Sequence, residues 1–166
     1  DIDLIVNASF SHQHYAIAKD CLEHGYNVLN EKPFAKTYYE SMDLINTAKK
    51  HGVLVTAFHQ SLYSPAVNVI RDILPTGKLG NIMQINLCWS GFSRRWDWQT
   101  LQHRVAGSLY NTGPHPVGMA LGFLDFDPDT SLIYSKLDTA LTFGDADDYA
   151  KIILTAPGKP VIDVEI

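Results

Sequence analysis

The sequence predicts an α/β protein whose architecture changes along the chain. A parallel sheet with crossover helices comes first, and an α+β region with a mostly antiparallel, open sheet follows. Two observations support this prediction. Short apolar strands alternate with amphipathic helices through the first third, which is the pattern of βαβ units. After Gly80, apolar and polar residues alternate one by one, which is typical of a strand with one buried face.

The parallel sheet is predicted from three short apolar runs with helices between them. The expected strands are residues 3–8, 27–30 and 53–58, and the expected helices are residues 12–24 and 37–51. The second helix begins with a capping box, in which the Thr37 hydroxyl and the Glu40 carboxylate satisfy amides that have no partner within the helix. Ser64 and Pro65 then begin a third helix, which runs to about residue 74.

The second sheet is predicted to begin at residues 83–90, where Ile85 and Leu87 alternate with polar neighbours. An irregular stretch to Gly107 precedes a helix expected at residues 116–124. The remaining expected strands are residues 132–137, 140–143, 149–155 and 161–166, separated by Gly, Asp and Pro turns.

Composition and charge argue against several classes of protein. Thirteen basic and eighteen acidic residues give a formal charge of −5 without any basic block, so we predict no nucleic-acid partner. Cys21 and Cys88 lie far apart, so we predict neither a metal site nor a disulfide, and a reducing, cytoplasmic setting fits best. No apolar run approaches the roughly 20 residues that span a bilayer. Because the chain begins and ends in strand-like segments, we expect a fragment of a longer protein.

The candidate binding segments follow the predicted strands, because open parallel sheets bind ligands beside their carboxyl ends. Ser9 and Ser11 precede a helix, where they either lie against a cofactor or simply cap that helix. Lys32, fixed by Pro33, can hold its ammonium over a substrate hydroxyl and stabilise a developing alkoxide. A surface pair of Glu31 and Lys32 before a turn is the alternative.

The densest candidate segment is residues 107–117, which contains His115 between two prolines and four residues after Asn111. His115 lies just ahead of the predicted helix, whose N-terminus disfavours the imidazolium form and keeps the ring available as a base. A purely structural histidine is the alternative.

The loop at residues 94–98 reads Arg-Arg-Trp-Asp-Trp and mixes cations with aromatic rings. Trp96 and Trp98 either line a sugar pocket or pack into the core, and the sequence favours neither.

In their order along the chain, these motifs resemble the Gfo/Idh/MocA family, which includes glucose-fructose oxidoreductase and inositol dehydrogenase. The resemblance is carried by residues 7–14 (NASFSHQH), residues 30–33 (NEKP), the loop ending at Trp98, and residues 107–117 (GSLYNTGPHPV). Glu-Lys-Pro alone is common, but Glu-Lys-Pro followed about eighty residues later by Gly-Pro-His-Pro is quite specific.

The resemblance implies that residues 1–58 are the C-terminal half of an NAD(P)-binding Rossmann domain, so that the parallel sheet is a partial Rossmann-type sheet. It implies that residues 59–166 form an α/β substrate and oligomerisation domain, incomplete at its C-terminus, whose open sheet makes homo-oligomer contacts. Lys32 and His115 then match the catalytic residues, with Asn111 beside the histidine, and the Lys32–Pro33 bond is expected to be cis. The residues expected at the NAD or NADP are Ser9, Ser11, His12, Glu31, Lys32, Pro33 and Trp96.

Three departures from the family pattern stand out. The Gly-x-Gly-x-x-Gly turn and two upstream strands are absent from the sequence, so we expect the chain by itself to bind the dinucleotide poorly or not at all. Asn111 replaces a frequent aspartate, and an amide can orient the His115 ring without offsetting its positive charge. Gly118 replaces a polar residue, which removes one possible substrate contact.

The resemblance therefore implies an NAD(P)-dependent oxidoreductase that transfers hydride between nicotinamide and a secondary alcohol of a sugar or cyclic polyol. His115 would take the hydroxyl proton while Lys32 holds the oxygen. The alternative is a catalytically weak or inactive homologue that binds nicotinamide or sugar, with the fragment itself an inert remnant. Asn111 favours this alternative. Neither the substrate nor the choice between NAD and NADP follows from the sequence.

Overall fold

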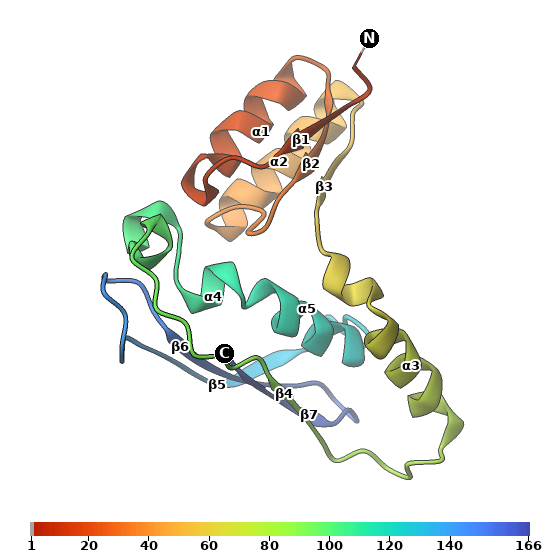
Figure 1. Ribbon diagram of the computed structural model, residues 1–166. Helices are drawn as coiled ribbons and strands as arrows, with labels where there is room; N and C mark the ends of the chain where they lie inside the picture. Colours follow the sequence, from red (N-terminus) through yellow and green to blue (C-terminus); the bar gives the residue numbers. More distant parts are fainter. Residues whose placement is uncertain (1) are drawn as a thin grey trace.

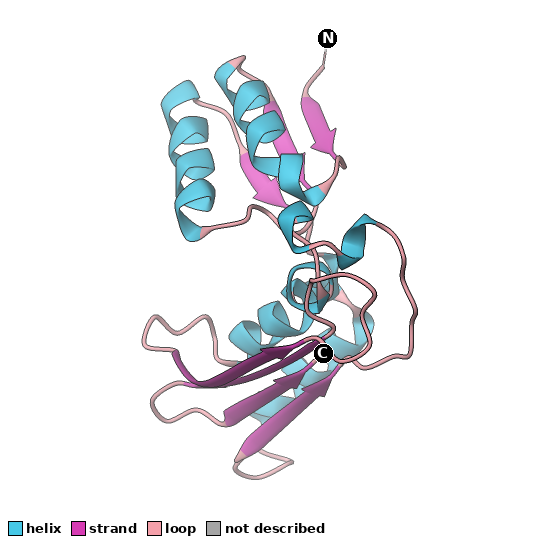
Figure 2. Cartoon of the chain, turned by 90° about the vertical axis from the view of Figure 1, so that its left-hand side faces the viewer, coloured by secondary structure: helices cyan, strands magenta, loops and turns pink. Residues whose placement is uncertain are grey.

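A computed structural model of the protein describes residues 2–166 and shows two sheets with helices between and beside them (Figure 1). The first sheet is parallel, in the order β1-β2-β3, and consists of β1 (Leu4–Asn7), β2 (Asn27–Asn30) and β3 (Val55–Ala57). The crossover helices are α1 (His14–Glu23) and α2 (Tyr38–His51). Both pack on one face of the sheet (Figure 2), because successive right-handed crossovers that advance in one direction emerge on the same side.

The core of this first unit lies between the two helices and the sheet, and consists of Ala18, Leu22, Val28, Leu44 and Ala48. The predicted capping box at the start of α2 is confirmed. The Thr37 hydroxyl accepts from the Glu40 amide at 3.1 Å, and the Glu40 carboxylate accepts from the Thr37 amide at 3.2 Å. These bonds satisfy amides that the first helical turn leaves without partners.

The second sheet has the order β4-β7-β6-β5 and is formed by β4 (Gln84–Cys88), β5 (Ser131–Asp138), β6 (Tyr149–Thr155) and β7 (Val161–Glu165). β4 and β7 are parallel, and the other two pairs are antiparallel. The helices of this part are α3 (Pro65–Ile73), α4 (Ser108–Asn111) and α5 (Pro114–Phe123). Short 3-10 turns are η1 (Ser11–Gln13), η2 (Gln60–Tyr63), η3 (Leu74–Thr76), η4 (Trp98–Thr100) and η5 (Gln102–Arg104).

α5 lies across one face of the second sheet, and its apolar side chains form a core with β6 and β7. The buried residues of this core are Val67, Met119, Ala120, Phe123, Leu124, Ala150, Leu154, Ala156, Ile162, Val164 and Ile166. α4 and α5 therefore lie between the second sheet and the first unit (Figure 1). Within the described residues, no helix is long and apolar enough to cross a bilayer.

Two predictions about the second part are wrong. Residues 140–143 are a loop rather than a strand, because the Asp148 carboxylate accepts from the amides of Ala140 and Leu141 at 2.6 and 2.7 Å. Those amides are then unavailable to a neighbouring strand. The helix expected at residues 116–124 begins two residues earlier at Pro114, since proline suits the first helical position. His115 thus lies within the first turn of α5 and not ahead of it.

Candidate functional site

Lys32 and Asn111 join the two parts of the molecule. Lys32 follows β2, and its cis peptide bond to Pro33 agrees with the expectation from the resemblance. Its Nζ donates to the Asn111 backbone carbonyl at 2.6 Å and to Asn111 Oδ1 at 2.9 Å. An ammonium has three N–H donors, so these bonds leave one donor for another acceptor. The Asn111 amide in turn donates to Gln99 Oε1.

The backbone around Lys32 is held by buried polar side chains at the ends of β1 and β2 and at the start of α1. Asn7 donates to Asn30 Oδ1 at 2.6 Å and to the carbonyl of His14 at 3.1 Å. The His14 ring lies 2.7 Å from the Pro33 carbonyl through Nδ1. These three side chains are almost fully buried, so their hydrogen bonds are costly to break. For Asn7 and Asn30 the sequence signal is a polar residue that ends each apolar strand, whereas no local signal marks His14.

The ring of His115 is fixed by neighbours from outside α5. Its Nδ1 lies 3.0 Å from the Ser61 hydroxyl, and the Trp89 ring stacks on it at 5.5 Å and 19°. With Nδ1 bound to Ser61, Nε2 is the nitrogen available for proton transfer. Burial first, and then the positive charge of Lys32, lower the pKa of His115, so the ring is neutral and able to act as a base near pH 7.

The expectation that Asn111 orients the His115 ring is wrong. The Asn111 side chain bonds Lys32 and Gln99, and Ser61 takes the orienting position. The physical reason is that α4 ends at Asn111 and a new helix begins at Pro114, so residues 111 and 115 do not share one continuous helix face.

Gly118 makes room for His59. A Cβ at position 118 would lie 2.0 Å from His59 Cε1, so the imidazole occupies the place of a side chain. The rings of His59 and His115 are 5.8 Å apart, and His59 Nε2 is buried without a hydrogen-bond partner among the described residues. Burial lowers the pKa of His59, which keeps this ring neutral beside His115.

The residues predicted to line the cofactor, apart from Trp96 in the loop after β4, lie beyond the carboxyl ends of β1 and β2. Ser9 Oγ donates to Asn7 Oδ1 at 2.7 Å, and the Glu31 carboxylate accepts from the Lys32 amide at 3.0 Å. His12 Nε2 accepts from Arg104 at 2.8 Å, and burial followed by the Arg104 charge lowers the pKa of His12. Ser11 begins η1. Contact of these residues with a dinucleotide stays a prediction.

The two tryptophans of the Arg-Trp-Asp-Trp loop have different surroundings. Trp96 is 73% exposed, so core packing is wrong for this residue. Trp98 packs its ring edge-to-face on Phe10, at 5.3 Å and 77°, and so contacts the loop after β1.

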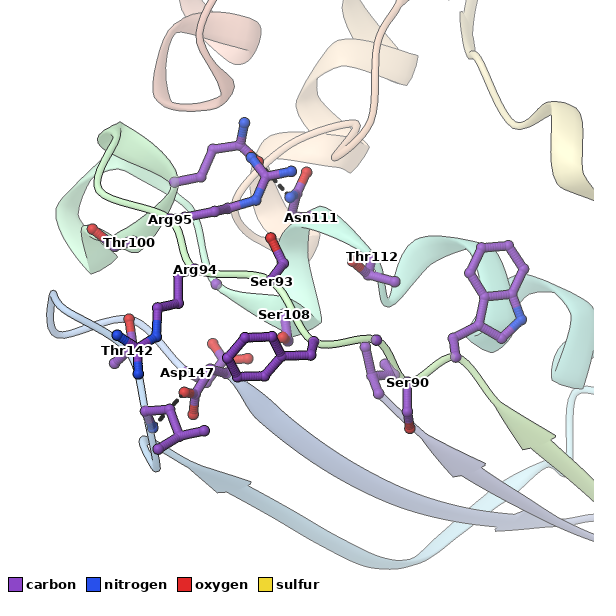
Figure 3. Close-up of a pocket in the computed structure, with 18 of the residues that line it drawn as sticks. Ser90, Ser93, Arg94, Arg95, Thr100, Ser108, Asn111, Thr112, Thr142 and Asp147 are labelled. Carbon is purple, nitrogen blue, oxygen red and sulfur yellow. Dashed lines mark hydrogen bonds between the residues drawn. The ribbon is translucent and has the colours of Figure 1, made fainter.

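A cavity of about 1030 Å³ lies beside residues that contact Lys32 and His115. The loop after β4, α4 and the loop between β5 and β6 line it, as Figure 3 shows. Its walls include Asn111, which binds Lys32, and Trp89, which stacks on His115. Lys32 and His115 thus each contact a residue of the cavity wall. No group of three His, Cys, Asp or Glu side chains within residues 2–166 could hold a metal ion.

The fold combines a Rossmann-type parallel sheet with a second, mostly antiparallel sheet. A model described as the oxidoreductase family with an NAD-binding Rossmann fold matches residues 1–59. The GFO/IDH/MocA C-terminal domain matches residues 67–166. The chain belongs to the GFO/IDH/MocA family, as the resemblance implied.

Similar proteins include two dehydrogenases of Bacillus subtilis. The scyllo-inositol 2-dehydrogenase (NADP(+)) IolW is 25% identical over 72% of this chain and 34% of the relative. Glucose-6-phosphate 3-dehydrogenase is 23% identical over 97% of this chain and 49% of the relative. The crystal structure of GenD2 from gentamicin A biosynthesis, in complex with NAD, has a TM-score of 0.88 at 19% identity, covering 98% of this chain and 47% of that chain. The chain spans less than half the length of these proteins.

Proposed function

We propose that the protein containing this chain transfers hydride between NAD or NADP and a secondary alcohol of a sugar or cyclic polyol. The observation that carries the proposal is that Lys32, from the parallel-sheet part, and His115, from α5, contact Asn111 and Trp89, two residues that line one cavity. Their charges are close enough that Lys32 lowers the pKa of His115. Membership in an oxidoreductase family and the two named dehydrogenases support a sugar or polyol substrate.

The segment after β1 and its neighbour Arg104 offer hydrogen-bond donors that suit the ribose or amide oxygens of a nicotinamide dinucleotide. His12 Nδ1 and Arg104 Nε are buried donors without partners among residues 2–166, and both lie by the loop after β1. Donors of this kind suit ribose or amide oxygens. We propose that Ser9, His12 and the Lys32–Pro33 segment contact the cofactor, which when bound accepts the hydride. The sequence contains no Gly-x-Gly-x-x-Gly turn for the pyrophosphate.

In this mechanism, the neutral His115 ring takes the hydroxyl proton at Nε2 while Ser61 holds Nδ1. The remaining N–H of Lys32 donates to the substrate oxygen as negative charge develops there. Burial lowers the pKa of Lys32, which strengthens this donor. The substrate carbon loses a hydride as its hydroxyl loses a proton, and the product is a carbonyl. In the reverse direction His115 returns the proton.

The test is NAD(P)H formation by the full-length protein over a panel of neutral and anionic sugars and polyols, with NAD and NADP tried separately. We expect substrate-dependent NAD(P)H, and a loss of at least about 100-fold in Lys32→Ala. Lys36→Ala, four residues along and exposed, is the matched control and should retain turnover. Cofactor binding without turnover of any panel member would contradict the proposal and support the inactive binding homologue.

We also propose self-association through the open sheet. All eight residues of β5 are exposed, including Leu132, Ile133 and Leu137 at 50% or more. An exposed apolar strand of this kind marks an interaction surface. Sedimentation velocity should show a dimer or larger species that Ile133→Lys dissociates, and a monomeric wild type would contradict this.

A further inference from the structure

Two adjacent arginines line the cavity from the loop after β4. Arg94 extends toward Thr142 on the loop between β5 and β6, whereas Arg95 extends toward Asn111 (Figure 3). The two side chains thus extend into different parts of the cavity. The reaction proposed above involves Lys32 and His115 and gives Arg94 no role.

The two arginines also differ in their partners. Arg95 Nη1 lies 3.5 Å from Asp97 Oδ2, and its charge helps to lower the pKa of Lys32, for which burial is the larger cause. Arg94 lies over the Phe92 ring, 5.9 Å from its centroid. It forms no ion pair with any carboxylate in the part of the chain that the structure describes.

The carboxylates of the cavity wall are already used by backbone amides. Asp147 Oδ2 accepts from the Leu109 amide at 2.8 Å, where it holds the first turn of α4. The Asp148 oxygens accept from the amides of Ala140 and Leu141. Neither carboxylate is paired with Arg94, although both lie in the wall that the loop between β5 and β6 contributes.

The rest of the lining suits a sugar with an anionic group. Ser90, Ser93, Thr112 and Thr142 supply hydroxyls, and Phe92, Trp96 and Phe143 supply aromatic faces. Hydroxyls can bond a sugar's hydroxyls, and aromatic faces cover its apolar side. A guanidinium presents parallel N–H donors that match two oxygens of a carboxylate or phosphate.

We infer that the cavity takes a sugar or polyol that carries a carboxylate or a phosphate ester, and that Arg94 binds this anionic group. The inference rests on the proposed function for the reaction and adds the charge of its substrate. Arg94 is a specificity residue here, because it contacts the substrate away from the oxidised carbon. A charge-assisted bidentate contact predicts a preference of about 10-fold to 100-fold for the anionic substrate.

The experiment compares matched substrates with the full-length protein: glucose, glucuronate and glucose 6-phosphate, together with inositol and an inositol phosphate. We expect kcat/KM to favour an anionic member by at least about 10-fold. Arg94→Ala should reduce that preference at least about 10-fold by raising KM more for the anionic than for the neutral member, and Arg94→Lys should retain part of it. The carboxylate and phosphate arms identify which anion the cavity takes. Lys49→Ala, on the exposed side of α2, controls for net charge.

Calorimetric titration of the same ligands in the presence of cofactor keeps this inference separate from the proposed reaction. Anion binding that depends on Arg94, without NAD(P)H formation, would support the subsite and contradict the dehydrogenase activity. The anion subsite would be contradicted if the protein bound or oxidised neutral sugars alone, or if Arg94→Ala lowered affinity equally for neutral and anionic ligands. Oxidation of neutral sugars would still support the proposed dehydrogenase activity.

Discussion

Alanine at position 118 tests whether the His59 imidazole occupies the place of a missing side chain. The added Cβ would lie 2.0 Å from His59 Cε1 and 2.8 Å from Nε2, well inside van der Waals contact. The imidazole lies 5.8 Å from the His115 ring, and its Nε2 is buried. We therefore expect Gly118→Ala to displace the ring, although alanine itself suits the interior of α5.

The magnitude follows from two opposing terms. Overpacking a buried site costs about 1 to 3 kcal/mol. Replacing a helical glycine by alanine contributes up to about 1 kcal/mol of stabilisation. The net expectation for Gly118→Ala is a loss of up to about 2 kcal/mol. In a His59→Ala background the overpacking disappears, so the same substitution should stabilise the protein by up to about 1 kcal/mol.

The assay is urea unfolding of the wild type, both single variants and the double variant, analysed as a double-mutant cycle. The expected coupling free energy is about 1 to 3 kcal/mol. Gly122→Ala is the matched control on the same helix, because the one close contact of its Cβ would be with the flexible end of Arg71, 2.8 Å from Nη2, and Phe126 Cζ would lie at an ordinary 3.8 Å. An equal effect of Gly118→Ala in both backgrounds would refute the placement of His59.

Three further predictions follow from the contacts of the site. Ser61→Ala removes the bond to His115 Nδ1 and should lower kcat about 10-fold with little change in KM, whereas Ser61→Thr should rescue it; unchanged kcat and an unchanged pH profile would remove Ser61 from the mechanism. Asn111→Asp places a carboxylate where Oδ1 lies 2.9 Å from Lys32 Nζ, so it should raise the pKa of Lys32 and move the basic limb of kcat/KM to higher pH. A shift of the acidic limb alone would instead indicate contact with His115. Burial holds His12, His59 and His115 neutral, with pKa values below the ordinary 6.5. As the pH is lowered through about 6.5, the unfolded chain therefore binds more protons than the folded one. The free energy of unfolding should decrease as the pH is lowered and level off below the folded-state pKa values. Urea unfolding between pH 7.5 and 5.5 should show this slope, with a smaller slope in His59→Gln; identical slopes would contradict it.

Much of the fold was predictable because its signals are local. The capping box at Thr37, the proline that begins α3, and the alternation of apolar residues in β4 each act within a few residues. The strand expected at residues 140–143 failed for a tertiary reason. Its amides are taken by the Asp148 side chain, and nothing within residues 140–143 signals that competition.

The site residues, too, fall into those with a local sequence signal and those placed by tertiary contacts. Lys32 and His115 were found because prolines beside them mark constrained backbone at a strand end and a helix start. Ser61 was missed, although it lies in the segment after β3, because its partner is 54 positions away. Asn111 was assigned to His115 because they are four residues apart, whereas its partner Lys32 is 79 positions away. Tertiary contacts over such separations leave no periodic signal in a single sequence.

The most direct test of the account is kcat/KM for NAD(P)H formation by the full-length wild type, Lys32→Met and His115→Asn, on whichever panel substrate is oxidised. Each substitution should lower kcat/KM by at least about 100-fold while the protein stays folded. The acidic limb of the wild-type pH profile should lie below the ordinary histidine value of 6.5, because burial and Lys32 lower the pKa of His115. Wild-type turnover in either variant would contradict the assignment of these two residues to proton transfer.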